Sequence, residues 1–290
     1  MSARHALRVR PGTWIVLAVG SVAGLAMFLW PLLTSPPPGT AHHVEAPYIF
    51  VVILPLVIGV LLAEISSGGL DVKAIAMLGL LAGVGAALRP LGAGTAGVET
   101  VFFLLILAGR VYGPGFGFVL GSTTLFASAF LTGGVGPWLP FQMLAASWVG
   151  LGAGLLPPVR GRAEIALLAL YGAVAAYAFG FLLNMWFWPF ALGTSLSAST
   201  DGGIHFVPGD AVVTNLVRFV RFTLATSTLG WDTGRAITTV IAIVTLGTPV
   251  LASLRRARRR VAFQPDVRFE ALEPASPASD ADDHFADVRL

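Results

Sequence analysis

The chain has no cysteine, one lysine and few charged residues of any kind. Of its 290 residues, 11% are charged and 56% are hydrophobic, and the mean hydropathy is +0.81. The absence of cysteine excludes disulfides, iron–sulfur clusters and thiolate metal sites. Such hydrophobicity lies far outside the range of soluble domains, because a single core of this size has no room for so many long apolar runs. The composition therefore predicts a polytopic membrane protein.

The sequence also lacks the residues that common catalytic sites require. All five histidines fall outside the predicted membrane crossings, so a metal hydrolase or a Ser/His protease within the bilayer would lack its essential side chains. Lys73, the only lysine, is followed by Ala74, whereas a P-loop needs Gly-Lys-Ser/Thr. We therefore expect no enzyme, no catalytic residue, no metal and no cofactor. The net charge of +3 lies in short loops at membrane ends, so we expect no nucleic-acid partner.

The acidic residues near the predicted crossings lie at the ends of the crossings and not within them. Ion-coupled carriers have buried carboxylates on the translocation path. Glu64, Glu99, Glu164 and Asp232 instead fall at the ends of predicted crossings. This placement favours transport driven by a partner protein over transport driven by protons or sodium.

Eight apolar runs are long enough, or nearly so, to cross a bilayer as helices. The predicted crossings are Trp14–Leu33, Tyr48–Glu64, Ala74–Leu88, Val98–Ala108, Gly113–Leu131, Leu139–Leu156, Ala163–Phe187 and Ile237–Leu254. They predict an all-α membrane bundle. Residues 1–73 hold a cytoplasmic N-terminus and two additional transmembrane helices, residues 74–254 form a six-helix core, and residues 255–290 form a basic, then acidic, disordered tail. Within the core, Ala191–Asp232 is the predicted outer loop, and its amphipathic segment Ala211–Leu224 lies in the membrane interface.

Positive charge predicts the orientation of this bundle. With eight crossings, the main basic clusters fall on one side, which the positive-inside rule assigns to the cytoplasm. These clusters are the N-terminus, Lys73, Arg110, Arg160 with Arg162, and Arg255–Arg260. We therefore expect a multi-pass protein of the inner (plasma) membrane with both termini in the cytoplasm.

Glycines recur every four residues at the start of the fifth predicted crossing. Gly113, Gly117 and Gly121 fall on one helix face, where missing side chains let another backbone approach closely. Helices associate in this way in lipid, and the pattern predicts a packing face.

The predicted core resembles the substrate-binding S components of energy-coupling factor (ECF) vitamin transporters, of actinobacterial type. Two motifs carry the resemblance, A-G-R-V-Y-G-P-G-F-G-F-V-L-G and G-G-V-G-P-W-L-P-F-Q-M-L-A-A-S-W-V-G-L-G-A-G. A helix rich in small residues precedes them: Gly79, Ala82, Gly83, Ala86 and Ala87.

The resemblance implies capture of a vitamin-like small molecule on the outer face. The protein would then dock on a transmembrane T component driven by two ABC ATPases. Members of this type are often assigned to cobalamin, so cobalamin or a related compound is the expected substrate. The implied partner interface comprises Gly79, Ala82, Gly83 and Ala86, with Gly113, Gly117 and Gly121. Packing of the small residues within the chain is an equally open alternative.

The resemblance also places the substrate near the outer surface, against the loops after core helices 1, 3 and 5. The candidate contacts there are Arg89, Glu99, Trp138, Gln142, Asn184, Trp188, Trp231 and Asp232. Aromatic walls with a few oriented polar groups suit a flat heterocyclic ligand. Interfacial anchoring of the tryptophans and a local ion pair between Arg89 and Glu99 remain alternatives. Two other functions stay open, a self-contained secondary permease and a non-transport membrane scaffold.

Overall fold

The computed structural model of the chain is helical wherever it describes long stretches of backbone. It describes residues 11–33, 55, 58–59, 62–63, 72–92, 97–191, 203–207 and 209–262. The elements are α1 (Pro11–Phe28), α2 (Trp30–Leu33), α4 (Val72–Leu88), η1 (Arg89–Leu91), α5 (Val101–Tyr112), α6 (Pro114–Thr132), α7 (Leu139–Leu155), α8 (Arg162–Ala191), α9 (Val212–Thr223), η2 (Leu224–Asp232) and α10 (Thr233–Ala262). The predicted N-terminal residues 1–10, most of the crossing at Tyr48–Glu64 and the tail beyond residue 262 lie outside the described residues.

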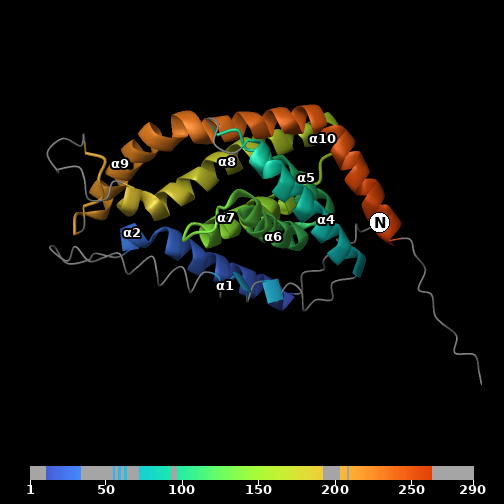
Figure 1. Cartoon of the computed structure of the whole chain (residues 1–290), viewed down its shortest axis with the longest axis horizontal. Helices are drawn as coiled ribbons and strands as arrows, with labels where there is room; N and C mark the ends of the chain where they lie inside the picture. The colour runs from blue at the N-terminus through green and yellow to red at the C-terminus, as the bar shows by residue number, and fades with distance from the viewer. Residues whose placement is uncertain are drawn as a thin grey trace, which may run out of the picture.

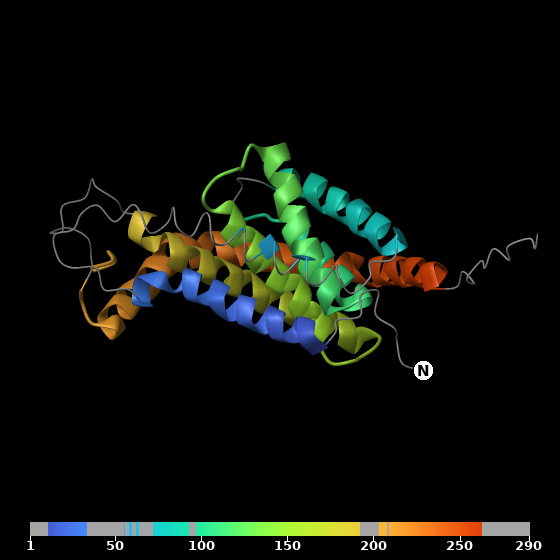
Figure 2. The same ribbon diagram turned by 90° about the horizontal axis from the view of Figure 1, so that it is seen from below.

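Three long elements run along the longest axis of the molecule. Figure 1 shows α1 along one edge, with α8 and α10 side by side along the other. Helices α4 to α7 fill the space between these edges, and the view from below shows α4 and α6 rising away from the layer of long helices (Figure 2).

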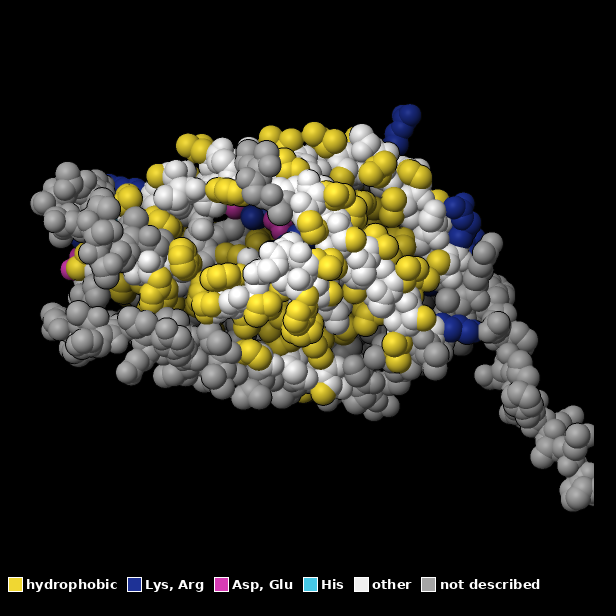
Figure 3. All heavy atoms as spheres, in the orientation of Figure 1, with side chains coloured by type: hydrophobic (Ala, Val, Ile, Leu, Met, Phe, Trp, Pro, Cys, Tyr) yellow, Lys and Arg dark blue, Asp and Glu magenta, His cyan; other side chains and the backbone are white. Residues whose placement is uncertain are grey.

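Four helices are long and apolar enough to cross a membrane, by length and composition. They are Lys73–Leu91, Pro114–Thr132, Arg162–Phe190 and Val212–Arg259, and shorter apolar helices occur at Trp14–Phe28, Val101–Tyr112 and Leu139–Leu155. Large hydrophobic side chains on the outer faces of these helices stay exposed, among them Val22 (69%) and Leu170 (65%). Figure 3 shows hydrophobic side chains over much of the described part of one face. The chain is therefore a multi-pass membrane protein with a surface suited to lipid.

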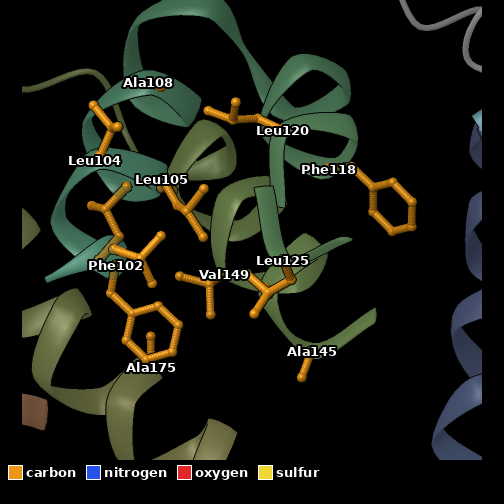
Figure 4. Close-up of a cluster of buried hydrophobic side chains, with 14 of the residues drawn as sticks. Phe102, Leu104, Leu105, Ala108, Phe118, Leu120, Leu125, Ala145, Val149 and Ala175 are labelled. Atoms are coloured by element: carbon orange, nitrogen blue, oxygen red, sulfur yellow. The ribbon is translucent and has the colours of Figure 1, made fainter. Parts of the chain in front are cut away.

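The short helix α5 occupies the centre of the bundle. Phe102, Leu105, Ile106 and Leu107 have no exposed surface, and they pack among side chains of α6, α7 and α8 (Figure 4). Ten of its twelve residues are buried, as expected of a helix that neighbouring helices enclose.

The glycine face of α6 packs inside the chain. A Cβ atom at Gly117 would lie 2.5 Å from the Gly150 carbonyl carbon of α7, and one at Gly121 would lie 2.5 Å from the Ala146 carbonyl carbon. Gly113, at the N-cap of α6, is also buried. The prediction of a close-packing face is confirmed, but its assignment to a partner interface is wrong, because α7 already covers this face.

The first helix is docked on the core. Trp148 of α7 donates a hydrogen bond from Nε1 to Ser21 Oγ of α1 at 3.0 Å, and the rings of Phe28 and Phe141 meet edge to face at 5.1 Å. The Trp30 indole of α2 donates to the Trp186 carbonyl of α8 at 3.3 Å. This additional N-terminal helix is thus part of the bundle.

The C-terminal third differs from the prediction of a loop with a separate interfacial helix. Helices α9, η2 and α10 follow one another without a break from Val212 to Ala262. No proline interrupts the chain before Pro249, and hydroxyl groups bond back to carbonyls one turn earlier, as Thr226 does to Phe222 and Thr238 to Gly234. Phe219 of α9 is buried, and its ring meets the Phe181 ring of α8 edge to face at 4.9 Å.

Candidate functional site

A cavity of about 240 Å³ opens where the end of α4 meets the middle of α8 and the junction of η2 with α10. Charged and aromatic side chains line it together: Arg89, Glu99, Gln142, Phe179, Trp231 and Arg235. Figure 3 shows acidic and basic side chains at the bottom of a hollow in an otherwise hydrophobic face. Charged groups in the apolar part of a membrane protein are costly, so their presence at one cavity marks a candidate functional site.

Two arginines and two carboxylates form a linked network at this cavity. Arg235 donates from Nε to Glu99 Oε2 at 2.6 Å and from Nη1 to Asp232 Oδ1 at 2.9 Å. Arg89 Nε lies 3.7 Å from Glu99 Oε1. Asp232 is 2% exposed and takes a further hydrogen bond at 2.9 Å from the Ser227 hydroxyl. Each charge has an opposite charge beside it, as burial in a low-dielectric setting requires.

Arg89 also bonds to neutral groups on α6 and α7. Its Nη1 donates to Ser128 Oγ at 2.9 Å, and its Nη2 donates to Gln142 Oε1 at 3.0 Å. A guanidinium only donates hydrogen bonds, so this contact fixes which end of the Gln142 amide faces the arginine. Arg89 therefore links the end of α4 to α6 and α7 at the edge of the cavity.

The Arg235 guanidinium is enclosed by aromatic rings. Its Cζ atom lies 5.6 Å from the Phe102 ring centre and 5.0 Å from the Phe179 ring centre. Cation–π attraction of this kind strengthens when water is excluded. The rings and the two carboxylates together hold Arg235 in one orientation against the cavity wall.

Backbone approach fixes the loop that precedes α5. Gly97 adopts a φ of +76°, and a Cβ atom there would lie 2.7 Å from the Trp231 Cα atom. Only glycine combines this backbone conformation with such a close approach. Trp231 is 46% exposed and lines the cavity, and its backbone is packed against Gly97.

Five of the eight predicted contacts lie at the cavity. Arg89, Glu99, Gln142 and Trp231 line it, and Asp232 lies behind them as a partner of Arg235. They come from segments far apart in the sequence, which the fold brings together.

Three predicted contacts lie elsewhere. Trp138 is 42% exposed, and its indole donates to the nearby Gly134 carbonyl at 3.1 Å. Asn184 donates to Thr223 Oγ1 at 2.5 Å and so joins α8 to α9. Trp188 has no exposed surface and donates to the Ile204 carbonyl at 2.7 Å. The structure gives these residues packing roles outside the cavity, and their role as substrate contacts stays a prediction.

Arg235 and Phe179 are the main cavity residues that the sequence prediction missed. Arg235 carried a signal, because it stands three residues after Asp232 and directly before a long uncharged run, a spacing at which helical side chains pair. Phe179 carried none, since it is one of many apolar residues in α8.

The small residues of α4 divide between two faces. Ala82 and Ala86 are buried at 7% and 2% exposure, so the chain itself covers them and their assignment to a partner interface is wrong. Gly79 and Gly83 lie on the exposed face, and Cβ atoms at these positions would meet nothing within 4 Å. Of the two faces of α4, only this second one is open to a partner helix.

A second ionic cluster closes the opposite end of the bundle, which we call the basic end. Glu164 accepts hydrogen bonds from Arg110 Nε at 2.9 Å and from Arg255 Nη2 at 2.6 Å. Arg255 follows Arg235 by twenty positions on α10, and no charged residue lies between them. At 1.5 Å per residue the two arginines are about 30 Å apart, the thickness of a bilayer core. The cavity and the basic end thus lie one hydrocarbon layer apart along α10.

Within the part of the chain that the structure describes, no group of three or more His, Asp or Glu side chains could hold a metal ion. Comparison with protein-family models, with curated proteins and with solved structures finds no match to this chain. The site must therefore be interpreted from its own chemistry. It offers oriented hydrogen-bond donors and acceptors beside aromatic side chains, a combination typical of binding sites for small polar molecules.

Proposed function

We propose that this protein is the solute-capture subunit of a partner-driven importer, the role of the S component in an ECF transporter. The observation that carries the proposal is the charge-lined cavity about one hydrocarbon thickness from the basic end. A buried ionic network in a membrane bundle is expensive and is retained where it recognises or conducts a solute. The basic end then faces the cytoplasm, and the cavity opens toward the outside.

Two further features support this role. The sequence has no Walker motif, so energy for uphill transport must come from elsewhere. The exposed face of α4 carries Gly79 and Gly83 among exposed Ile75, Leu80 and Val84, which suits close packing by a helix of a T component.

The size of the cavity argues against cobalamin as the solute. A volume of 240 Å³ lies just below the range of about 300–1,000 Å³ that encloses drug-sized ligands, and a corrinoid is far larger. The predicted outer loop Ala191–Asp232 is helical from Val212 to Asp232. We therefore propose a smaller solute.

A self-contained ion-coupled permease is the second candidate. One observation favours it: two carboxylates lie beside the cavity, Asp232 buried at 2% exposure and Glu99 partly buried at 16%. Buried carboxylates are the groups that couple ion binding to transport. Their pairing with Arg235 favours the capture subunit, because a paired carboxylate is less free to exchange a proton or a cation.

Purification of the tagged full chain from its native membranes tests the proposal. We expect a pair of ABC ATPases and a further membrane protein to be recovered with it in mild detergent. Gly83→Leu should abolish that recovery, because a leucine would fill the groove between two packed helices. Ala178→Leu is the matched control, since Ala178 lies on the exposed face of α8.

Uptake by reconstituted vesicles separates the candidates. Gradient-driven uptake by this chain alone would replace our proposal with the permease. A chain that recovers no ATPase and retains no solute would contradict both candidates and favour a scaffold.

A further inference from the structure

The charge balance of the cavity restricts what it can bind. Arg89 and Arg235 face Glu99 and Asp232, so the network is formally neutral. A ligand anion would meet two carboxylates as well as two arginines, and it would have to displace Glu99 from Arg235 to be neutralised. A ligand cation meets the reverse problem. A neutral ligand leaves all the ion pairs intact.

Two polar groups at the cavity have unused hydrogen-bonding capacity. The amide oxygen of Gln142 accepts a hydrogen bond from Arg89. Both N–H donors of Nε2 remain without a partner among the described residues. Glu99 Oε1 lies 3.7 Å from Arg89 Nε, a separation too long for a hydrogen bond. The cavity thus offers a donor from α7 and an acceptor from the segment before α5, while each oxygen of Asp232 already accepts a hydrogen bond, from Ser227 and from Arg235.

The walls and the volume define the rest of the ligand. Trp231 presents a half-exposed indole at the cavity, and Phe179 and Leu183 add apolar surface. Aromatic faces of this kind stack on flat rings. The volume of about 240 Å³ lies below the range of about 300–1,000 Å³ that encloses drug-sized ligands, which suits a ligand of one or two rings.

We infer that the cavity selects an uncharged nitrogen heterocycle of one or two rings that carries an N–H donor beside a C=O acceptor, as an amide or lactam does. The N–H donates to Glu99 Oε1, the C=O accepts from Gln142 Nε2, and the ring stacks on Trp231. This inference rests on the proposed function and adds the chemical class of its solute.

Matched probes test the charge and the N–H separately. The full-length protein in nanodiscs is titrated with nicotinamide, with nicotinate and with N,N-dimethylnicotinamide, and binding is followed by ligand-observed NMR. Uracil and its carboxylate orotate form a second pair. We expect nicotinamide and uracil each to bind at least about tenfold more tightly than the matching anion, because either carboxylate faces Glu99 and nicotinate also lacks the N–H donor. We expect dimethylation of nicotinamide to cause a similar loss.

Gln142→Glu replaces the donor of the proposed contact with a second acceptor and adds a negative charge beside Arg89. A glutamate still accepts from Arg89, so the unfolding temperature should not fall while amide binding falls at least about tenfold. Trp138→Phe is the control, because Trp138 lies outside the cavity and should leave binding unchanged.

The outcomes distinguish this inference from the proposed function. Tighter binding of nicotinate than nicotinamide, or amide binding unaffected by Gln142→Glu, would overturn the inference. So would the absence of amide binding when mass spectrometry finds a charged solute retained by the purified protein, and in that case the proposed function stands. If no amide binds and no solute is retained, both are wrong.

Discussion

Replacing glycine by alanine at Gly117 and at Gly83 should change stability in opposite directions. Both glycines lie inside helices, where alanine is favoured by up to about 1 kcal/mol. At Gly83 a Cβ atom meets nothing within 4 Å, so Gly83→Ala should stabilise the protein by about that amount. At Gly117 the added atom would lie 2.5 Å from the Gly150 carbonyl carbon and 3.0 Å from the Gly109 Cα atom.

Carbon atoms pack at about 3.5–4.0 Å, so Gly117→Ala forces α6 and α7 apart by about 1 Å. Overpacking of this kind costs about 1–3 kcal/mol, which exceeds the propensity gain. The propensity gain is common to both variants and cancels in the comparison, so the two should differ by the overpacking cost, about 1–3 kcal/mol. Reversible unfolding in mixed micelles, followed by tryptophan fluorescence, measures the difference. Equal stability of the two variants would refute the packing of α6 on α7 described above.

Three other changes should have separable effects. Glu164→Ala leaves two arginines at the basic end without their carboxylate and should cost about 3–5 kcal/mol in unfolding, whereas a loss below about 1 kcal/mol would mean that the cluster is hydrated. Asn184→Leu breaks the bond to Thr223 and should cost about 1–3 kcal/mol without altering solute binding, and a binding defect equal to that of Gln142→Glu would place Asn184 at the site. Gly97→Ala should both destabilise the protein and shift the fluorescence of Trp231, measured against Trp231→Phe, and an unchanged spectrum would contradict their backbone contact.

The order and extent of most helices could be predicted from the sequence, because uncharged apolar runs end at charges, glycines and prolines. Val72–Leu88 and Leu139–Leu155 differ by at most two residues from their predicted bounds. The stretch from Val212 onward was harder. Its serines, threonines and Gly230 are typical of a loop, yet the hydroxyl groups bond to helical carbonyls and α8 buries one side. Tertiary packing overrides local propensity there.

The candidate site was predictable only in part, from polar side chains near the ends of apolar runs. Arg89, Glu99 and Gln142 stand out at the ends of apolar runs, and the fold brings them together. Asn184 and Trp188 had the same appearance in the sequence. Both, however, use their side-chain N–H groups in hydrogen bonds between α8 and neighbouring segments, to Thr223 and to Ile204. Which polar side chains are used for packing depends on helix neighbours, and hydrophobic patterns do not specify these.

The continuous helix from Val212 to Ala262 makes the two ends of the bundle mechanically dependent. Trp231 and Arg235 at the cavity and Arg255 at the basic end belong to one continuous helical stretch. The two arginines are about 30 Å apart along it. A rotation of about 5° around the basic end carries the cavity wall sideways by about 2.6 Å, close to the length of a hydrogen bond. A protein that binds the arginine-rich end can thus release a solute from the cavity without contacting the solute.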